Sequence, residues 1–164
     1  MAEEIIIRPA RAEDMDEVCE IARVAWQPVF EEFRRRLGDE LFGRLHSSWE
    51  QRKMNDVRQV FEQYPGCMLV TEVGGRVAAF VTYFFIDKAK GLGEISNNAV
   101  HPELQGRGLA RKQYERVFEE LRARGAEYVR VTTGLDDAHA PARRAYEAVG
   151  FGGELPVVTY YREL

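Results

Sequence analysis

Apolar and polar positions alternate with different periods along this chain, and the changes of period predict where its strands and helices lie. Runs rich in β-branched and aromatic residues, bounded by glycine, proline or polar residues, predict strands. Two of these runs flank Gly74-Gly75, which is the signal of a hairpin. The expected strands cover residues 5–7, 67–72, 76–86, 94–100, 128–133 and 157–161.

Apolar residues at helical spacing predict the helices that lie between these strands. Asp14 and Glu17 have the spacing of a helix cap and its return partner, and the apolar stripe of the first helix begins at Val18. Pro28 is expected to stop that helix or to start the next one. Two more helices are expected within residues 29–63, one from near Gly108 to Gly125, and one from Ala138 to Ala148.

The elements follow the order strand, helices, antiparallel meander, helix, strand, helix, strand. This order predicts an α/β fold (α+β) with a mixed sheet, and not a regular doubly wound fold. The 164 residues contain no repeat, low-complexity tract or Pro/Gly-rich linker, and the length suits one domain. We therefore expect a single domain over residues 1–164.

The composition bears on whether the protein is globular, membrane-spanning or secreted. Apolar residues make up 45% of the chain and charged residues 30%, which suits a real core and a water-exposed surface. The longest apolar runs are too short and interrupted to span a bilayer, and the first residues lack the pattern of a secretory signal. Cys19 and Cys67 have no metal-ligand spacing and indicate a reducing compartment. We expect a cytoplasmic protein without a membrane partner.

Charge is distributed unevenly. The net charge of −4 argues against a general nucleic-acid binder. The first fifty residues hold 12 acidic and 7 basic side chains, a balance of −5. If these fifty residues line the entrance to a substrate site, their negative charge would favour a cationic ligand. Composition alone favours a solvated acidic helix face instead.

The segment from Val100 to Ala110 carries the clearest chemical signal. A strand ends at Val100, Pro102 blocks its extension, and a helix starts near Gly108. Two glycines at this junction, Gly106 and Gly108, allow a ligand to approach the backbone closely. A helix start offers unpaired N–H groups and the positive end of the helix dipole, which together suit a pyrophosphate.

Three motifs in this chain resemble one known family. Gln105-x-x-Gly108-x-Ala110, after a Val-x-Pro strand end, resembles the acetyl-CoA signature Arg/Gln-x-x-Gly-x-Gly/Ala of the GNAT superfamily of N-acetyltransferases. Residues 139–151, where a helix carries Ala and Tyr and closes with Gly-Phe, resemble the second signature of that family. The start, Ile-x-Arg-Pro-Ala-x-x-Glu-Asp, is also typical of it. The P-loop motif is absent and the dinucleotide-binding pattern is not completed.

The resemblance covers nearly the whole chain and implies a fold and an activity. The implied fold is a central mixed, mostly antiparallel sheet of about six to seven strands, flanked by helices and splayed at the acetyl-CoA site. The implied activity is acetyl transfer from acetyl-CoA, as co-substrate, to a primary amine of a small molecule or a protein. The transfer would be direct, in a ternary complex, without a metal.

Other functions fit the same resemblance. Transfer of another acyl group is one alternative, and a non-catalytic CoA-binding sensor or interaction domain is another. The motifs leave the acceptor amine open, and they leave open whether the protein forms a homodimer. Trp26, Phe30, Trp49, Tyr83 and Phe84 are aromatic candidates for an acceptor pocket, although such residues more often belong to the core.

The resemblance also implies which residues bind the cofactor. The pantetheine arm is expected to pair with the end of strand 94–100, and the N–H near Val100 is expected to hold the thioester oxygen. His139 stands where the family usually has an Asn that orients the cofactor, so it either substitutes as a donor or faces solvent. The expected cofactor-binding residues are Asn98, Ala99, Val100, Gln105, Gly106, Arg107, Gly108, Leu109, Ala110 and His139.

Two residues are expected to be catalytic. Glu94 lies six positions before Val100, the offset at which some family members place a general base. Tyr146 occupies the tyrosine position of the second signature and could protonate the leaving thiolate. A solvent-exposed strand-edge Glu and a core Tyr are the alternatives. The adjacent amides Asn97 and Asn98 put a polar side chain on each face of the strand, which is compatible with a β-bulge.

Overall fold

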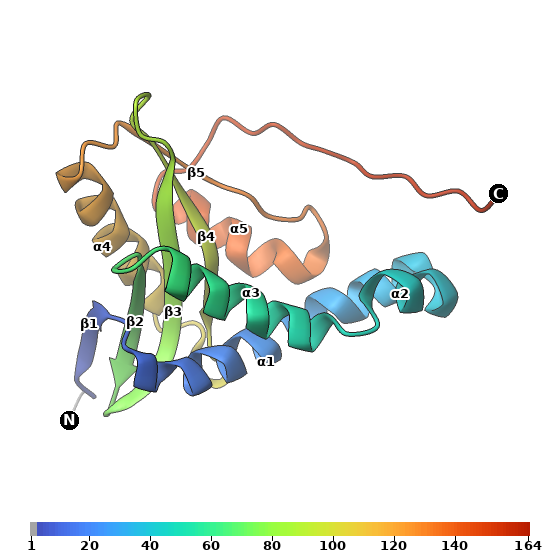
Figure 1. Cartoon of the computed structure of the whole chain (residues 1–164), viewed down its shortest axis with the longest axis horizontal. Coiled ribbons are helices and arrows are strands. Elements are labelled where there is room, and N and C mark those ends of the chain that lie inside the picture. Colours follow the sequence, from blue (N-terminus) through green and yellow to red (C-terminus); the bar gives the residue numbers. More distant parts are fainter. Residues whose placement is uncertain (1–2) are drawn as a thin grey trace.

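Five strands form one sheet whose spatial order is the order of the strands in the chain (Figure 1). The computed structural model describes residues 3–164. Its strands are β1 (Ile5–Pro9), β2 (Met68–Val73), β3 (Arg76–Asp87), β4 (Leu92–Val100) and β5 (Tyr128–Val131). Neighbouring strands are antiparallel except β4 and β5, which are parallel. The expected mixed, mostly antiparallel sheet and the hairpin at Gly74-Gly75 are confirmed.

Helices cover both faces of this sheet (Figure 1). The long helices are α1 (Met15–Leu37), α2 (Asp39–His46), α3 (Trp49–Gln63), α4 (Leu109–Ala123) and α5 (Ala140–Ala148). Short 3-10 turns are η1 (Ala12–Asp14), η2 (Pro102–Leu104) and η3 (Asp137–His139). One core cluster joins α1 and α3 to the sheet through Val18, Val57 and Phe80. A second cluster joins α4 and α5 to the opposite face through Val117, Tyr146 and Ile95.

Helix α1 continues through Pro28, so the expected helix boundary at this residue is wrong. Proline has no N–H, and the usual bond to the carbonyl of Val24 is therefore missing. Burial on both sides of the proline offsets this loss, because Ala22 and Val29 are both buried. The two further helices expected before residue 63 are confirmed as α2 and α3.

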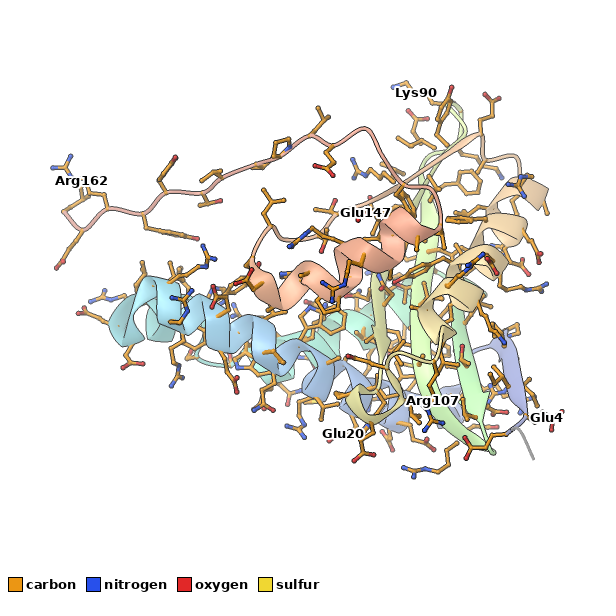
Figure 2. The ribbon with its side chains drawn as sticks, turned by 180° about the vertical axis from the view of Figure 1, so that it is seen from behind. Glu4, Glu20, Lys90, Arg107, Glu147 and Arg162 are labelled. Carbon is orange, nitrogen blue, oxygen red and sulfur yellow. The ribbon has the colours of Figure 1, made fainter. Side chains whose placement is uncertain are left out.

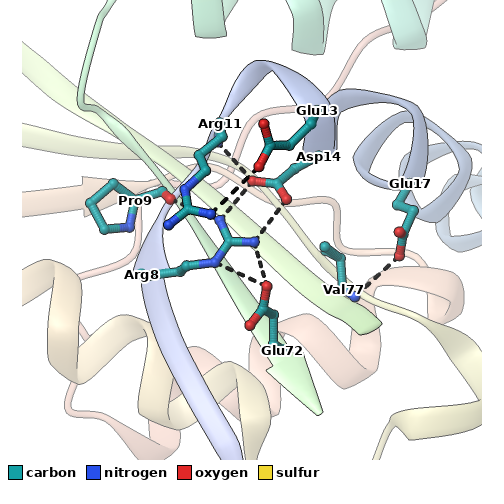
Figure 3. A network of polar contacts seen from close by, with 8 residues as sticks. All are labelled: Arg8, Pro9, Arg11, Glu13, Asp14, Glu17, Glu72 and Val77. Atoms are coloured by element: carbon teal, nitrogen blue, oxygen red, sulfur yellow. Dashed lines mark hydrogen bonds and ion pairs between the residues drawn. The ribbon is translucent and has the colours of Figure 1, made fainter. Parts of the chain in front are cut away.

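The start of α1 is held by an ion-pair network in place of the expected cap (Figure 3). Asp14 makes no side-chain capping bond to α1; its carboxylate accepts bonds of 2.7 and 2.8 Å from the Arg8 guanidinium and one of 2.7 Å from the Arg11 N–H. Arg8 also bonds Glu72 on β2. Glu17 accepts a bond from the Val77 N–H on β3. The charge-assisted bonds of the Arg8 guanidinium to the two carboxylates join β1, η1 and β2.

The last expected strand, residues 157–161, does not form, and the sheet has five strands rather than the expected six to seven. Residues 151–164 have no helix or strand, and their end runs away from the sheet (Figure 1). Strand β5 is also shorter than expected, since it ends at Val131 rather than at Thr133. A strand needs a neighbouring edge, and the residues after Phe151 pair with none in the described chain.

Candidate active site at the divergence of β4 and β5

Strands β4 and β5 separate halfway along β4. Their parallel pairing runs from Leu92 with Tyr128 to Ile95 with Val131 and then stops. On its other side β4 stays paired with β3 as far as Val100 with Ala79. The second half of β4 therefore presents one backbone edge that β5 does not cover. The expected splay of the sheet at this strand is present.

A β-bulge lies at the point of separation. The pairing of β3 and β4 shifts by one residue between Val81 with Asn98 and Tyr83 with Ile95. The Thr82 hydroxyl fills the irregularity, because it accepts a bond of 2.8 Å from the Asn97 N–H and donates one of 3.1 Å to the Asn97 carbonyl. The bulge expected from the two adjacent asparagines is confirmed, and their side chains contact helices on opposite faces of the sheet.

Asn98 connects β4 to two buried tyrosines on the α4 and α5 face. Its amide donates a bond of 2.9 Å to the Tyr146 hydroxyl, and its carbonyl accepts one of 2.6 Å from the Tyr114 hydroxyl. Tyr146 is 6% exposed, and burial raises the pKa of its hydroxyl although the bonds with Asn98 and Tyr114 oppose the shift. The hydroxyl is thus protonated at neutral pH and lies beside the open edge of β4. The sequence singled out Tyr146 but indicated no role for Tyr114.

The turn between β4 and α4 has the backbone form expected of an anion cradle. Gly106 and Gly108 have φ values of 77° and 75°, in the left-handed region that favours glycine. No atom lies within 4 Å of the position that a Cβ would take at either residue, so open space borders the backbone here. Gly108 is the residue from which α4 begins. Free N–H groups of the first helical turn and open space beside them fit a phosphate group.

The other expected residues of this turn have mixed environments. The Gln105 side chain donates a bond of 3.2 Å to the carbonyl of Val100 and so ties the turn to the strand end. Leu109 is 2% exposed and packs in the core, which leaves only its backbone for a ligand. Ala110 is half-buried against the α4 and α5 core cluster. Arg107 lies at the sheet end opposite Lys90 and forms an exposed ion pair with Glu3 (Figure 2).

His139 lies in a tight loop after β5. Its Nδ1 is 2.7 Å from a carboxylate oxygen of Asp136, and a Cβ added at Gly134 would come within 2.5 Å of that nitrogen. Arg143 donates bonds to the carbonyls of Gly134 and Asp136 and fixes the loop. Burial raises the pKa of Asp136, but the bonds from His139 outweigh it and leave that pKa below its usual value. The ring is therefore oriented by Asp136, and within residues 3–164 no hydrogen bond joins it to Asn98 or Tyr146.

Glu94 is held by β5. Its carboxylate accepts a bond of 2.7 Å from Arg130, the residue paired with it across the two strands. The side chain is 17% exposed. Its neighbour Ile95 packs with Tyr114, so the alternation of strand side chains directs Glu94 to the face of α1 and α3. Glu94 and Tyr146 thus lie on opposite faces of β4.

Lys53 is a site residue that the sequence did not indicate. Its ammonium lies 3.7 Å from the ring centroid of Trp26 on α1 and donates a bond to the Asn97 side chain at the bulge. Burial lowers the pKa of Lys53 to about 8. In the sequence of helix α3 this lysine has polar neighbours, and no local pattern distinguishes it from a solvent-exposed lysine.

The expected aromatic candidates are dispersed. Trp26 contacts Lys53 near the bulge, whereas Phe30 and Trp49 stack on each other at 4.3 Å farther along α1. Phe84 stacks on Tyr64. Tyr83 is 1% exposed and belongs to the core on the α4 and α5 face, so it is not available to line an acceptor pocket.

Residues 3–164 contain no group of three or more His, Cys, Asp or Glu placed to hold a metal ion. No helix in the same residues combines the length and the apolar character needed to cross a bilayer.

Comparison with known proteins identifies the family. The model of the Acetyltransferase (GNAT) family matches residues 26–151, most of the chain. The chain belongs to this family. A GNAT chain is an acyltransferase, and the matched range contains both divergent strands, the glycine turn and Tyr146. No curated protein matches the sequence at a significant level.

Solved structures share the fold of this GNAT chain. PaiA N-acetyltransferase from Thermoplasma acidophilum, in complex with coenzyme A, is 17% identical over 92% of this chain and 91% of that one, with a TM-score of 0.72. A GNAT acetyltransferase from Brucella melitensis, in complex with acetyl-CoA, is 20% identical over 96% of both chains, with a TM-score of 0.61. An aminoglycoside acetyltransferase from an uncultured soil metagenomic sample, in complex with sisomicin, is 17% identical over 98% and 96%, with a TM-score of 0.62.

Proposed function

We propose that this GNAT chain moves an acetyl group from acetyl-CoA to a primary amine by direct transfer in a ternary complex. The observation that carries the proposal is the junction at the end of β4. There an unpaired strand edge leads into a glycine turn and the start of α4, and a protonated tyrosine hydroxyl lies beside the same edge.

The backbone at this junction suits both ends of a CoA thioester. The edge of Asn98, Ala99 and Val100 can pair with the amides of a pantetheine arm as a further strand would. The N–H groups after Gly106 and Gly108 suit the pyrophosphate. A backbone N–H near Val100 would hold the thioester oxygen as negative charge develops on it.

Tyr146 is the proposed acid for the leaving thiolate. A thiol titrates near 8.5 when cysteine is the guide, and burial raises the pKa of the tyrosine hydroxyl above its ordinary value near 10. The hydroxyl therefore keeps its proton until a thiolate forms close to it and then hydrogen-bonds to the thiolate or protonates it. Asn98 holds the hydroxyl in place through the bond from its amide.

Glu94 is the proposed base for the amine. Glu94 lies four positions before Asn98, roughly 13 Å along the strand at the usual rise per residue. That separation favours proton removal through a chain of ordered waters rather than by direct contact. Arg130 fixes the carboxylate at the divergence of the two strands.

The amine is proposed to approach from the face of α1 and α3. On this face the Trp26 ring and the side-chain amide oxygen of Asn97 already bind one ammonium group, that of Lys53. An aromatic ring and an amide oxygen are suitable partners for a protonated amine. The acidic residues of α1 are weaker support for a cationic acceptor than this ammonium site. Glu20 and Glu32 already pair with neighbouring arginines. The acceptor is a small-molecule or protein amine.

Thiol release from acetyl-CoA over a panel of amines tests this function. We expect release only with an amine present, and acetylated amine in equal amount, after treatment with a chelator. Binding of acetyl-CoA without release with any amine would favour a CoA-binding sensor, and release only from succinyl-CoA would favour another acyl donor. A failure of acetyl-CoA to raise the melting temperature at millimolar concentration would contradict the proposal.

Three broader expectations accompany the proposal and stay predictions. The whole chain, residues 1–164, is expected to act as one N-acetyltransferase domain. We expect it in the cytoplasm, and we expect neither nucleic acid nor a membrane as its partner.

A further inference from the structure

Lysine is rare in this chain, and one lysine differs from the others in its surroundings. Only four of the 23 lysine and arginine residues are lysines. Lys88, Lys90 and Lys112 are exposed. Lys53 on α3 is half-buried, and within residues 3–164 no carboxylate lies at ion-pair distance from its ammonium. Burial without a counter-ion disfavours the charged form of this amine.

The ammonium of Lys53 lies on the face from which the acceptor amine is proposed to approach. Helix α3 brings it to β4 (Figure 1), where it donates a bond to the Asn97 side chain, and it lies 3.7 Å from the ring centroid of Trp26. Asn97 directly precedes Asn98, whose amide donates a bond of 2.9 Å to the Tyr146 hydroxyl on the other face. The lysine nitrogen and the proposed acid thus contact neighbouring residues of β4, at the start of its open edge.

The Lys53 amine is a nucleophile for part of the time at neutral pH. Attack on a thioester needs the nitrogen lone pair, which an ammonium lacks. Burial lowers the pKa of Lys53 to about 8, although the charge of Asp56 opposes the shift. About one in ten such side chains is neutral at pH 7, compared with roughly one in 2,500 for a lysine with the ordinary pKa near 10.4. This amine therefore depends less on a base than an external amine does.

We propose that the chain acetylates its own Lys53 with the acetyl-CoA held along β4. The Nζ lone pair attacks the thioester carbonyl carbon, an N–C bond forms, and the C–S bond breaks. The thiolate takes a proton from the Tyr146 hydroxyl, the nitrogen releases one to water, and water returns one to Tyr146. The products are free CoA and an uncharged acetyl-lysine, which leaves the Trp26 ring without its cation. The inference rests on the proposed acetyl transfer, because it uses the same donor and the same acid.

The surroundings of Lys53 favour a reaction within one chain. Its ammonium lies between Trp26 on α1 and Asn97 on β4, so a second copy has little access to it. The donor on the open edge of β4 belongs to the same chain. The exposed lysines, in contrast, are open to free acetyl-CoA and to other copies, and they serve as internal standards for uncatalysed acetylation.

Mass spectrometry after incubation with ¹³C-acetyl-CoA, without any external amine, tests the inference. The full chain is taken from the fraction whose intact mass shows no acetyl group. We expect the 18.8 kDa chain to gain one labelled acetyl group, which peptide mapping locates on Lys53. Lys53 should react faster than Lys112, the exposed lysine in the first turn of α4, by about tenfold or more. Tyr146→Phe should slow the labelling of Lys53 by about 10²-fold and leave that of Lys112 unchanged.

Thiol release with a panel of external amines, measured on the same preparation, separates the two proposals. Self-acetylation happens once, so it adds at most one thiol per chain to this release. Release with an external amine while Lys53 stays unlabelled overturns self-acetylation alone, and neither release nor labelling contradicts both proposals. Labelling of Lys53 no faster than that of Lys112, or equally fast in Tyr146→Phe, would mean uncatalysed acetylation and overturn the inference. A rate per chain that rises with protein concentration would mean transfer between copies and overturn it as well.

Discussion

The Asn98 side chain shows how much one residue does at this site. Its amide and carbonyl engage two hydroxyls, Tyr146 and Tyr114, from two different helices. The two rings lie 5.3 Å apart, so packing restricts them in addition to the hydrogen bonds. A hydroxyl that is oriented in this way needs no reorganisation when charge develops next to it.

Tyr146→Phe is expected to lower kcat by about 10²-fold or more, the usual contribution of a general acid. The KM for acetyl-CoA should change little, because the hydroxyl acts chiefly in the transition state. Steady-state kinetics measure both constants, and Tyr64→Phe, a change at an exposed tyrosine, is the control. Full turnover of a folded Tyr146→Phe variant would reduce this tyrosine to a packing residue.

Glu94→Gln keeps the shape of the side chain and removes its capacity to accept a proton. The rate at neutral pH is expected to fall by roughly 10²-fold. It should recover as the pH rises, because free amine then forms without a base. Glu103→Gln, an exposed change on η2, provides the comparison. A pH–rate profile identical to that of the unchanged protein would exclude Glu94 as the base.

Lys53 is expected to affect stability at alkaline pH. Its pKa is about 8 in the folded chain and near 10.4 when unfolded. Between these values the unfolded state binds more protons, so this residue makes the free energy of unfolding rise with pH. Urea titrations from pH 7 to 10 should show that Lys53→Met removes this rise and that Lys88→Met, an exposed change, does not. Equal slopes in all three proteins would contradict the buried ammonium.

Sequence reasoning found some of these residues and missed others for a physical reason. Glu94 and Tyr146 stand at motif positions, so the local sequence identifies them. Tyr114 and Lys53 act through partners 16 and 44 residues away in sequence. Nothing near them along the chain reveals those contacts, because only the packing of α4 and α3 on the sheet creates them.

At the scale of elements, the hydrogen bonds of Arg8 join three segments, which are β1, η1 and β2. Asp14 on η1 is 5% exposed, and its hydrogen bonds to Arg8 hold the pKa of that carboxyl below its ordinary value. A lowered carboxyl pKa stabilises the fold above the pKa of the unfolded state and loses that effect as the pH falls through the folded pKa.

Asp14→Asn is expected to destabilise the protein by about 2 kcal/mol, less than the cost of breaking a fully buried ion pair, because Arg8 keeps Glu72. The melting temperature should fall by about 4–8 °C at pH 7. The difference from the unchanged protein should shrink below about pH 4, because Asp14 takes up a proton there in the unfolded chain and at a still lower pH in the folded one. Calorimetry over this pH range measures the difference in melting temperature, with the exposed Asp16→Asn as control. A difference that stays the same at every pH would contradict the ion pair.

Element prediction succeeded where local rules and packing agree. The hairpin at Gly74-Gly75 and the glycine turn before α4 have residues that few other conformations tolerate. It failed at Pro28, where burial of α1 outweighs a missing hydrogen bond, and at residues 157–161, whose strand pattern finds no edge in the single chain. A pattern shows that a segment can form a strand, but not which strand would pair with it.

At the scale of the whole molecule, the sheet separates the proposed base from the proposed acid. Helices α1 and α3 cover the face with Glu94 and the Lys53 ammonium site, and α4 and α5 cover the face with Tyr146. Beyond the divergence of β4 and β5, the backbone edge of β4 is not covered by β5. A donor held along that edge would meet a base from one side and an acid from the other, which suits transfer in a single ternary complex.

Amide hydrogen exchange with and without acetyl-CoA tests most directly whether this junction is the donor site. The expected result is slower exchange, by about tenfold or more, at residues 96–100 and 106–110. Gly108→Val should reduce this protection at equal ligand concentration, because a side chain at a φ of 75° strains the turn and fills the space beside it. Protection confined to other segments, or none at millimolar acetyl-CoA, would contradict the placement of the donor at the end of β4.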